Sequence, residues 1–478
     1  MSLALGANPK VKQLSYAAVG AVLLGYASLS LGWLPPLFNT DVNPLLSFSR
    51  NSDAGILLGR ISIVISTGIL ISQWLVLGSN IRKGIENQRL LWQLFAIWTA
   101  PMLLAPAIFS RDVYSYIAQG RLVLSGFNPY TDGVSLVPGW FHLGVDPMWA
   151  TTPTPYGPIW IGLEALTVWL TPDSPFWSLV IFRLISLIAL IVMAIGIIKI
   201  AQHYEVSPSL ALWLSLSNPL TLFHLIGAIH NDSLMITLMV WGFYFSIRKK
   251  FLFAIFFILA ASLIKPIALL ALPIVMLEPN LRFSEKIRRW AYCGAFTLLA
   301  LWSIGQISTY GFDWIKALLT PGQVLTLLSP SSTLGYLTGI VAESLGIGTT
   351  ATFIAISRFV IFALALAIIA TYLIQTRAEN VVRVGAYVFA LIVIASPVIQ
   401  PWYLLWALAL VAPIGIRSVL HLRLIVFSTV FLVAYSTIEV EVARDFNLSA
   451  GDFIAVASVI VMMLLTFVSS KVARGLVR

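Results

Sequence analysis

The run FLFAIFFILAASLIKPIALLALPIVML, residues 251–277, decides the fold class of this chain. A helix needs about 20 consecutive apolar residues to cross the hydrocarbon core of a bilayer, and this run exceeds that length with a single charge, Lys265. Pro266 makes a break at Lys265 expected, because the residue before a proline is disfavoured in a helix. Two interpretations compete: one long kinked helix, or two short helices joined as a hairpin.

The composition of the whole chain also indicates a membrane protein. Of its 478 residues 59% are hydrophobic and 10% are charged, whereas a soluble domain carries roughly 25% charged residues. The net charge of +10 would suggest nucleic-acid binding in a soluble protein; here we relate it to orientation in the membrane. A single cysteine, Cys293, excludes a disulfide within the chain. The first apolar run, near 14–34, has no small-x-small cleavage site, so we expect a retained span and not a signal peptide.

Apolar runs of spanning length recur along the sequence, and no strand pattern appears. We therefore predict an all-α polytopic membrane protein. A further run at 155–170 starts with prolines and contains Glu164, so we expect a partly embedded helix there. The predicted spans, besides 251–277, are 14–34, 54–79, 90–109, 177–199, 208–228, 231–247, 288–309, 352–376, 382–397, 401–416, 420–438 and 451–470.

The distribution of Lys and Arg selects a topology. Cytoplasmic loops carry an excess of these residues. If the N-terminus is cytoplasmic, 155–170 does not cross and 251–277 is a hairpin, most of the 29 Lys and Arg lie inside with few of the 19 acids. Making 155–170 cross would place the cluster at 248–250 outside. We therefore expect about 14 crossings with both termini inside.

This topology gathers four polar features on the extracytoplasmic side. They are the loop 110–176, the link 230–232, the turn 265–266 and the stretch 400–403. Polar groups on one side suit an enzyme better than a transporter, which would keep them along a path through the membrane. The absence of a clear internal repeat also counts against a transporter built on repeated halves.

Asp112 follows the predicted span 90–109 directly. If 112–124 is helical, Asp112, Tyr116 and Gln119 share one face. Asp112 is then either the N-cap of that helix, with Arg111 able to neutralise it, or a general base that deprotonates a sugar hydroxyl within hydrogen-bond reach. Spacing alone leaves both alternatives open.

The loop after that helix is rich in proline, aromatic residues and acids. Its aromatic residues Trp140, Trp149, Tyr156 and Trp160 fit an interfacial belt, or they stack on sugar faces. No spacing distinguishes the acids of the loop and of the following run, which are Asp132, Asp146 and Glu164.

His230, Asn231 and Asp232 lie between two apolar runs. Asn231 or Asp232 can cap the helix that follows. Three adjacent polar groups, with His224 shortly before them, exceed what a cap needs, so they can also bind a hydroxylated substrate. No zinc-type ligand spacing occurs in the sequence.

Lys265 lies at membrane depth, where a charge is costly and marks a functional site by default. It either snorkels to the interface or contacts a lipid phosphate. Gln400 and Trp402 open the span 401–416, either as an interfacial anchor or with Gln400 reaching into a cavity. No glycine-rich nucleotide loop is present, so a sugar donor would have to arrive on a lipid phosphate.

Several motifs together resemble the GT-C superfamily of membrane glycosyltransferases and, more closely, the actinobacterial α-(1→6)-mannopyranosyltransferases of lipomannan synthesis. The resemblance covers nearly the whole chain. It implies a catalytic module over 90–309, two additional helices within 1–89, and an external loop with further helices over 310–478. The motifs are RDVYSYIAQGR (111–121), GFNPY (126–130), TPYGPIW (154–160), FRLISL (182–187), AIHND (228–232), LIKP (263–266) and SPVIQPWYLLW (396–406).

The resemblance implies a polyprenyl-phosphate mannose donor, a lipid-linked α-1,6-mannan acceptor and an extracytoplasmic active site in the plasma membrane. Asp112 matches the loop acid assigned as catalytic base, Asp232 a second acid, and Lys265 a lipid-phosphate contact. No cofactor and no nucleic acid are expected. The doubled loop acid of some relatives is absent, since Arg111 and Val113 flank Asp112; this favours one carboxylate over a metal-dependent site, with a divalent cation as the alternative. The predicted substrate-binding residues are Arg111, Tyr116, Tyr156, His230, Asn231, Asp232, Lys265, Gln400 and Trp402.

The expected reaction inverts the anomeric carbon. Asp112 takes the proton of the acceptor 6-hydroxyl, and the phosphate leaves with its charge offset by Lys265 and His230, in a displacement whose demands match those of inverting glycosidases. Two alternatives remain: transfer of another sugar, arabinose or glucose, from a polyprenyl phosphate, and transport of a lipid-linked sugar.

Overall fold

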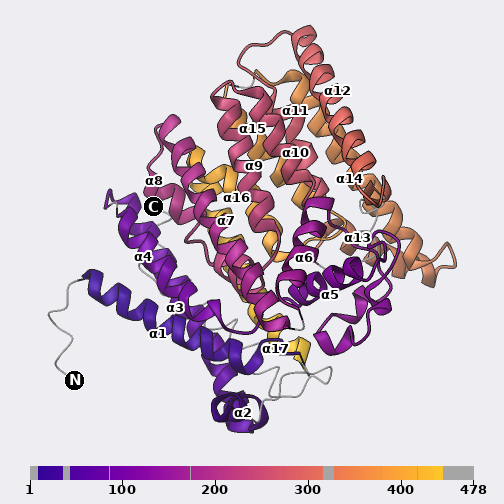
Figure 1. The fold of residues 1–478 in the computed structure, drawn as a ribbon. Coiled ribbons are helices and arrows are strands. Elements are labelled where there is room, and N and C mark those ends of the chain that lie inside the picture. The colour runs from indigo at the N-terminus through magenta and orange to yellow at the C-terminus, as the bar shows by residue number, and fades with distance from the viewer. Residues whose placement is uncertain are drawn as a thin grey trace.

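The computed structural model describes residues 9–35, 43–85, 87–172, 174–315, 328–377, 379–416 and 418–444. Over these residues the chain is helical, with one isolated β-bridge between Trp33 and Ala107 and no strand (Figure 1). The predicted all-α class is confirmed. The α-helices are α1 Pro9–Leu31, α2 Pro44–Asn51, α3 Asp53–Arg82, α4 Gln88–Thr99, α5 Asp112–Leu124, α6 Pro158–Leu170, α7 Pro175–His203, α8 Pro208–Leu214, α9 Asp232–Ile247, α10 Phe251–Ser262, α11 Leu272–Val275, α12 Phe283–Ile307, α13 Pro330–Ser344, α14 Thr350–Gln375, α15 Val381–Ala395, α16 Leu404–Val411 and α17 Val419–Arg444.

Six of the described helices are long and apolar enough to cross a membrane: α1, α3, α7, α12, α14 and α17. A π-helical turn, η6 Thr221–Gly227, and α9 together make a seventh candidate, bent by 116°. The polytopic class is therefore confirmed, while the number of 14 crossings stays a prediction. The predicted span 451–470 lies outside the described residues.

Two predicted spans are broken, contrary to expectation. The run 90–109 is helical in α4 only to Thr99, followed by one 3-10 turn, Ala100–Leu103. The run 208–228 divides into α8 and η6, with Asn218 and Pro219 between them. Prolines explain both breaks: Pro101 and Pro106 in the first run and Pro219 in the second lack the N–H that a continuing helix needs. Hydropathy registers only that these segments are apolar.

The run 251–277 is a hairpin of two short helical arms. The alternative interpretation, one long kinked helix, is therefore wrong. The chain leaves through α10, turns at Lys265, and returns through the 3-10 helix η7 Pro266–Ala271 and α11. The return is shown by Ser246, whose Oγ donates to the carbonyl of Val275 at 2.6 Å. Glu278 then lies 3.7 Å from Lys249, next to the residue where the hairpin began.

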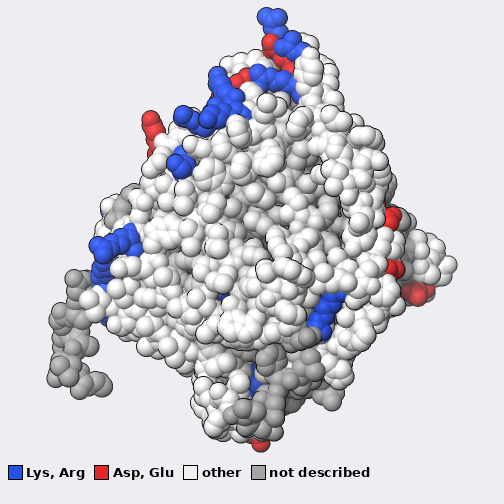
Figure 2. All heavy atoms as spheres, viewed as in Figure 1, with Lys and Arg blue, Asp and Glu red and all other residues white. Residues whose placement is uncertain are grey.

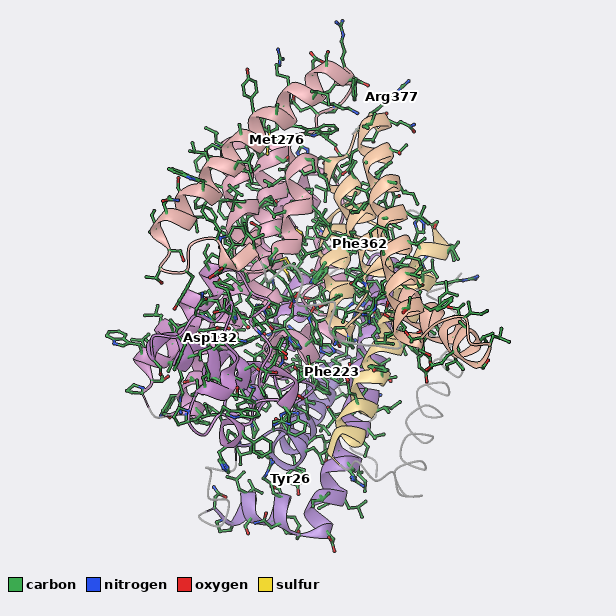
Figure 3. All side chains as sticks on the ribbon, turned by 90° about the vertical axis from the view of Figure 1, so that its right-hand side faces the viewer. Tyr26, Asp132, Phe223, Met276, Phe362 and Arg377 are labelled. Atoms are coloured by element: carbon green, nitrogen blue, oxygen red, sulfur yellow. The ribbon has the colours of Figure 1, made fainter. Side chains whose placement is uncertain are left out.

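Basic side chains gather at one end of the molecule, here called the basic end and defined by 248–250, 282–289 and 377. Figure 2 shows Lys and Arg along the upper edge of the view, with a largely uncharged band below them. Figure 3 places Met276 and Arg377 at this end and Phe223, Asp132 and Tyr26 in the other half. Lys286 helps to join the helices here by donating to the carbonyl of Ile374 at 2.8 Å.

Helices α5 and α6 form a compact layer at the opposite end. Both predicted helices are present, at 112–124 and within 155–170. The start of α6 docks on the hairpin turn, since the N–H of Gly157 donates to the carbonyl of Ile264 at 2.9 Å. A Cβ on Gly157 would lie 2.3 Å from the oxygen of Leu263, so this close approach requires glycine. The loop and the hairpin are thereby fixed to each other.

Candidate active site

The four polar features predicted to share one side of the membrane meet in a single cluster at the end opposite the basic end. The Asp112 carboxylate lies 3.2 Å from His230 Nδ1, and the ring of His230 stacks on that of Trp402 with centroids 3.5 Å apart. Lys265 Nζ lies 2.7 Å from the Asp232 carboxylate. The external loop, the two interhelical links and the start of the span at 401 thus contribute to one site.

Asp112 is the first residue of α5, and its carboxylate does not cap the helix. The N-cap position is Arg111, which makes no side-chain capping bond. The Asp112 carboxylate instead accepts from His230, and 19% of the side chain is exposed to solvent. The capping alternative is therefore wrong, and the carboxylate is both held by His230 and open to a substrate.

The surroundings of Asp112 keep it ionised. Burial raises the pKa of the Asp112 carboxyl, but the hydrogen bond and charge of His230, the charge of Lys265 and a hydrogen bond from Trp149 lower it, and the net pKa lies below its ordinary value. A carboxylate that is deprotonated at neutral pH can accept a proton.

His230 is buried, and one of its two ring nitrogens is hydrogen-bonded. Its side chain is 1% exposed, Nδ1 donates to Asp112, and Nε2 has no hydrogen-bond partner among the described residues. The stacked ring of Trp402, itself 8% exposed, fixes the plane of the imidazole. Of the two alternatives for this stretch, the interfacial anchor does not fit Trp402, because its indole is buried against His230; its role in binding substrate stays a prediction.

Lys265 is paired, and this differs from the lone cation that the sequence suggests. Asp232 is fully buried and accepts from Lys265 Nζ at 2.7 Å and from Trp406 Nε1 at 2.6 Å. Asp232 is thus not a helix cap, and Asn231, at the N-cap position of α9, makes no capping bond either. The ammonium lies 5.2 Å from the ring centroid of Tyr403 and is 16% exposed. Since an ammonium has three N–H donors, Lys265 retains donors for an anion.

Tyr116 and Tyr156 lie behind the cluster, in an aromatic layer. Their rings meet edge to face at 5.4 Å, and their exposed fractions are 0% and 4%. The hydroxyl of Tyr116 accepts from the backbone N–H of Asn231 at 3.4 Å. Burial, followed by the charges of Asp112 and Asp232, raises the pKa of the Tyr116 phenol well above its ordinary value. These contacts give both tyrosines a supporting position behind the carboxylates.

Arg111 points away from the cluster. Its Nε donates to the carbonyl of Gly144 at 2.8 Å, NH2 donates to that of Val145 at 2.9 Å, and the guanidinium lies 4.4 Å from the Trp33 ring centroid. The expectation that Arg111 neutralises Asp112 is therefore wrong, because His230 is the residue that contacts the Asp112 carboxylate. Arg111 ties the external loop to the end of α1.

Gln400 precedes Trp402 by two residues, and its carbonyl accepts from the N–H of Tyr403 at 3.0 Å; its side chain forms no hydrogen bond with the described residues. It is partly buried, precedes the 3-10 turn η9 Pro401–Tyr403, and makes no side-chain capping bond there. Its predicted role in a cavity stays a prediction.

Two residues of the site region, Arg183 and Trp406, were given no role in the sequence analysis, and His224 was noted only as a polar group near His230. His224 is fully buried and its Nε2 lies 2.8 Å from Ser436 Oγ. Arg183 lies inside the apolar helix α7 and is also fully buried. A charge within a spanning run is a recognisable signal of function that applied to Arg183 as much as to Lys265.

The two site carboxylates are engaged by cationic or aromatic side chains and not by one another. Among the described residues no group of three or more His, Cys, Asp or Glu is arranged to hold a metal ion. Asp112 accepts from His230 and Asp232 from Lys265. Because this group of side chains includes the ammonium of Lys265, it favours binding of an anion over binding of a metal cation.

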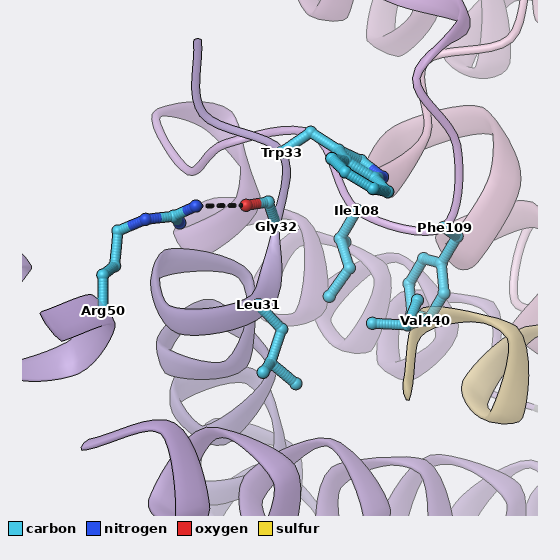
Figure 4. Close-up of a pocket in the computed structure, with 7 residues that line it drawn as sticks. All are labelled: Leu31, Gly32, Trp33, Arg50, Ile108, Phe109 and Val440. Atoms are coloured by element: carbon cyan, nitrogen blue, oxygen red, sulfur yellow. Dashed lines mark hydrogen bonds between the residues drawn. The ribbon is translucent and has the colours of Figure 1, made fainter. Parts of the chain in front are cut away.

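A small pocket of about 60 Å³ adjoins the segment before Asp112 (Figure 4). Arg50 donates through NH2 to the carbonyl of Gly32 at 2.9 Å on its wall. The pocket contains none of Asp112, His230 and Lys265. Its lining residues are Leu31, Gly32, Trp33, Arg50, Ile108, Phe109 and Val440.

Comparison with protein families gives two matches that cover most of the chain. The model described as "Alpha-(1->6)-mannopyranosyltransferase, N-terminal domain" matches residues 15–279, and the "MptB C-terminal domain" matches residues 331–469. No solved structure matches.

Individual relatives carry the same description. "Alpha-(1->6)-mannopyranosyltransferase A" of Corynebacterium glutamicum is 35% identical over 218 residues, which are 44% of this chain and 44% of the relative. "Alpha-(1->6)-mannopyranosyltransferase B" of the same organism is 26% identical over 452 residues, 86% of this chain and 74% of the relative. "Alpha-(1->6)-mannopyranosyltransferase A" of Mycobacterium tuberculosis is 27% identical over 410 residues, 83% and 79% respectively.

Proposed function

Because the chain belongs to the α-(1→6)-mannopyranosyltransferase family, we propose that it moves mannose from polyprenyl-phosphate mannose to the 6-hydroxyl of a lipid-linked α-1,6-mannan. Family membership makes the chain a membrane mannosyltransferase. The nature of the sugar donor and acceptor, the side of the membrane and the roles of the residues are the proposal. The observation that carries it is the pairing of Asp112 with His230 beside the Lys265–Asp232 ion pair.

In this reaction the acceptor hydroxyl attacks the anomeric carbon of mannose. The new C–O bond forms as the bond from that carbon to the phosphate oxygen breaks, and the electron pair leaves on polyprenyl phosphate. The proton of the hydroxyl passes to the Asp112 carboxylate. Displacement from the side opposite the phosphate inverts the anomeric carbon, and a phosphate leaving group needs no acid to protonate it.

His230 and Lys265 have separate roles in this scheme. His230 donates Nδ1–H to the Asp112 carboxylate and orients it, since its own ring is fixed on Trp402. Lys265 offers its remaining N–H groups to the phosphate, and a charge-assisted contact of this kind is roughly twice as strong as a neutral one. Asp232 holds the ammonium in place at 2.7 Å.

The distribution of charge supports an extracytoplasmic site in the plasma membrane. The site lies at the end opposite the basic end, and the excess of Lys and Arg marks the cytoplasmic side of a membrane protein. A polyprenyl-phosphate donor places its phosphate at the membrane surface, where the turn of the hairpin at Lys265 also lies in this orientation.

The proposal is tested by product analysis with purified protein in detergent, labelled polyprenyl-phosphate mannose and a short lipid-linked α-1,6-mannan. We expect one mannose to be added in an α-(1→6) linkage. Because detergent abolishes vectorial transport, a transporter would give no product. Transfer only from an arabinosyl or glucosyl donor would contradict the choice of sugar.

Substitution tests the assignment of the base in the same assay. Asp112→Asn should lower turnover by about 100-fold or more, as expected for the loss of a general base. Asp132→Asn is the matched control, because Asp132 is an acid of the same loop whose carboxylate accepts from the backbone of Asn128 at 3.0 Å. Near-normal turnover of Asp112→Asn would remove Asp112 as the base.

A further inference from the structure

Arg183 lies in α7 beneath the two segments that lead into the site. Its side chain is fully buried, and its partners are main-chain carbonyl groups. Nε donates to Ile226 at 3.1 Å, and NH1 donates to Leu103 at 3.2 Å and to Ala105 at 2.6 Å. NH2 reaches the carbonyl of Pro106 at 3.5 Å. A planar guanidinium with five donors in a fixed fork can hold several groups at once in this way.

These carbonyls belong to the two broken spans. Leu103 ends the 3-10 turn after α4, and Ile226 lies in the last turn of η6. The last carbonyls of a helix lack an intrahelical partner and carry the negative end of its dipole. A buried cation next to two such ends satisfies the carbonyls, and they in turn compensate its desolvation.

The two segments lead directly to Asp112 and His230. Phe109 and Ile229 shortly precede those residues and adopt φ values of 72° and 62°, a region that is uncommon for residues other than glycine and that persists where surrounding structure enforces it. The N–H of Ile108 donates to the carbonyl of Gly227 at 3.2 Å, which joins the segments directly.

Neighbouring residues of α7 contact the same site from below. Phe182 meets the ring of Tyr116 at 5.7 Å, and Ser186 accepts from Ser233 at 3.0 Å, next to Asp232. One stretch of α7 thus supports the start of α5 and the start of α9. Arg183 is the member of this stretch that bonds to both broken spans.

We propose that Arg183 is a positioning residue for the mannosyl transfer, which sets the distance between Asp112 and His230 by clamping the segments that carry them. The inference rests on the proposed function, because it requires that Asp112 and His230 act together in the mannosyl transfer. Arg183 touches neither carboxylate and is no catalytic residue. Ser28 Oγ and the N–H of Trp33 also bind this region, at Pro106 and Ala107, but they do not reach η6.

The proposal predicts a specific kinetic defect. Lys265, the expected phosphate contact, lies on the hairpin and not on the clamped segments, so KM for the sugar donor should change little when Arg183 is replaced. The catalytic rate should fall, since a misplacement of about 1 Å can cost on the order of 100-fold.

The pH profile should move as well. Asp112 works as a base above its pKa, so the rate falls as the pH falls through that value. The hydrogen bond of His230 lowers the pKa of Asp112, and its loss should shift this fall to higher pH. The titratable groups that face Asp112 are His230, Lys265, Tyr116, Tyr156 and Tyr403; Arg183 is not one of them, so such a shift would act through position.

The experiment compares Arg183→Met and Arg183→Lys in the full-length protein in detergent, with rates normalised to folded enzyme. The matched control is Lys286→Met, because Lys286 is also a buried cation that donates to main-chain carbonyls, those of Leu373, Ile374 and Thr376, but at the basic end. We expect Arg183→Met to lose about 10- to 100-fold in kcat, with a shifted acid limb and a donor KM within about threefold. Arg183→Lys should recover part of the rate, and Lys286→Met should keep normal kcat and pH profile.

Two results would overturn the inference: wild-type kcat and pH profile in folded Arg183→Met, or a loss with no shift of the acid limb, as from simple instability. If Arg183→Met does not fold, Arg183→Lys decides alone, and an unchanged acid limb and kcat in it count against the proposal. Failure of the proposed function is separable, because it would show as an active Asp112→Asn variant. An inactive Asp112→Asn with normal Arg183 variants would refute only the role of Arg183.

Discussion

At the basic end an ion pair lies near solvent, whereas at the active-site end the corresponding pair is buried. Lys249 and Glu278 are 77% and 20% exposed and 3.7 Å apart. Lys265 and Asp232 are 16% and 0% exposed and 2.7 Å apart. The helices differ in the same way: α7, α12 and α14 run unbroken toward the basic end, and the breaks at 100–111 and 215–231 lie toward the site.

The difference shows what the site demands of the fold. A broken helix exposes main-chain carbonyls and brings polar side chains into an apolar interior, and each such group costs free energy unless it is paired. Arg183 and Trp406 provide those partners at the active-site end. At the basic end Lys286 satisfies the last carbonyls of α14 in a similar way, but those carbonyls belong to the end of a complete helix and not to a break within a span.

The largest effect on stability is expected for Asp232→Asn. Removing one partner of a buried ion pair leaves the other charge uncompensated and typically costs about 3–5 kcal/mol of unfolding free energy. Lys249→Met, which breaks the more exposed pair and leaves the contact of Glu278 with Arg289 in place, should cost about 1 kcal/mol or less. Thermal unfolding in detergent measures both. Equal losses of unfolding free energy in the two variants would contradict the proposed difference between the two ends.

A smaller effect, on the use of the sugar donor, is expected for Lys265→Met. Loss of a charge-assisted contact in a partly dry site is worth roughly 1.5–3 kcal/mol, or about 10- to 150-fold. Arginine should rescue only in part, since its planar fork differs from a compact ammonium. Titrations of donor and acceptor, normalised to folded enzyme, should show the defect for the donor with acceptor affinity nearly unchanged.

Lys249→Met is the control for this change, because it removes a cation from the exposed pair. It should leave donor titration unaltered. Unchanged donor kinetics in Lys265→Met would mean that Lys265 has only a structural role with Asp232.

The smallest effect is expected from metal removal. Asp112 and Asp232 are bound by His230 and Lys265, and this arrangement does not favour a shared cation. Activity should therefore survive exhaustive chelation. Loss of turnover with EDTA that a divalent ion restores would show that the two carboxylates share a metal in the working enzyme.

The sequence predicted which residues come together in the site better than it predicted the contacts between them. The Lys265-Pro266 step and the distribution of Lys and Arg predicted the hairpin, and with it the common end for Asp112, His230, Lys265 and Trp402. Hydropathy cannot show where an apolar run breaks, so the interruptions near Pro101 and Pro219 were missed. Pairing also escaped prediction, because Asp232 and Trp406 are far apart in sequence and their contact depends on packing.

The most direct test of the central claim, that Asp112 and His230 act as one unit, is a double-mutant cycle on turnover. If His230 works by holding Asp112, adding His230→Gln to Asp112→Asn should slow the enzyme little further, because residues that act as a unit are strongly non-additive. His230→Gln alone should be clearly slower than wild type, and its loss of rate on acidification should begin at a higher pH. If the two losses multiply instead, His230 acts independently of Asp112, and the account of the site is contradicted.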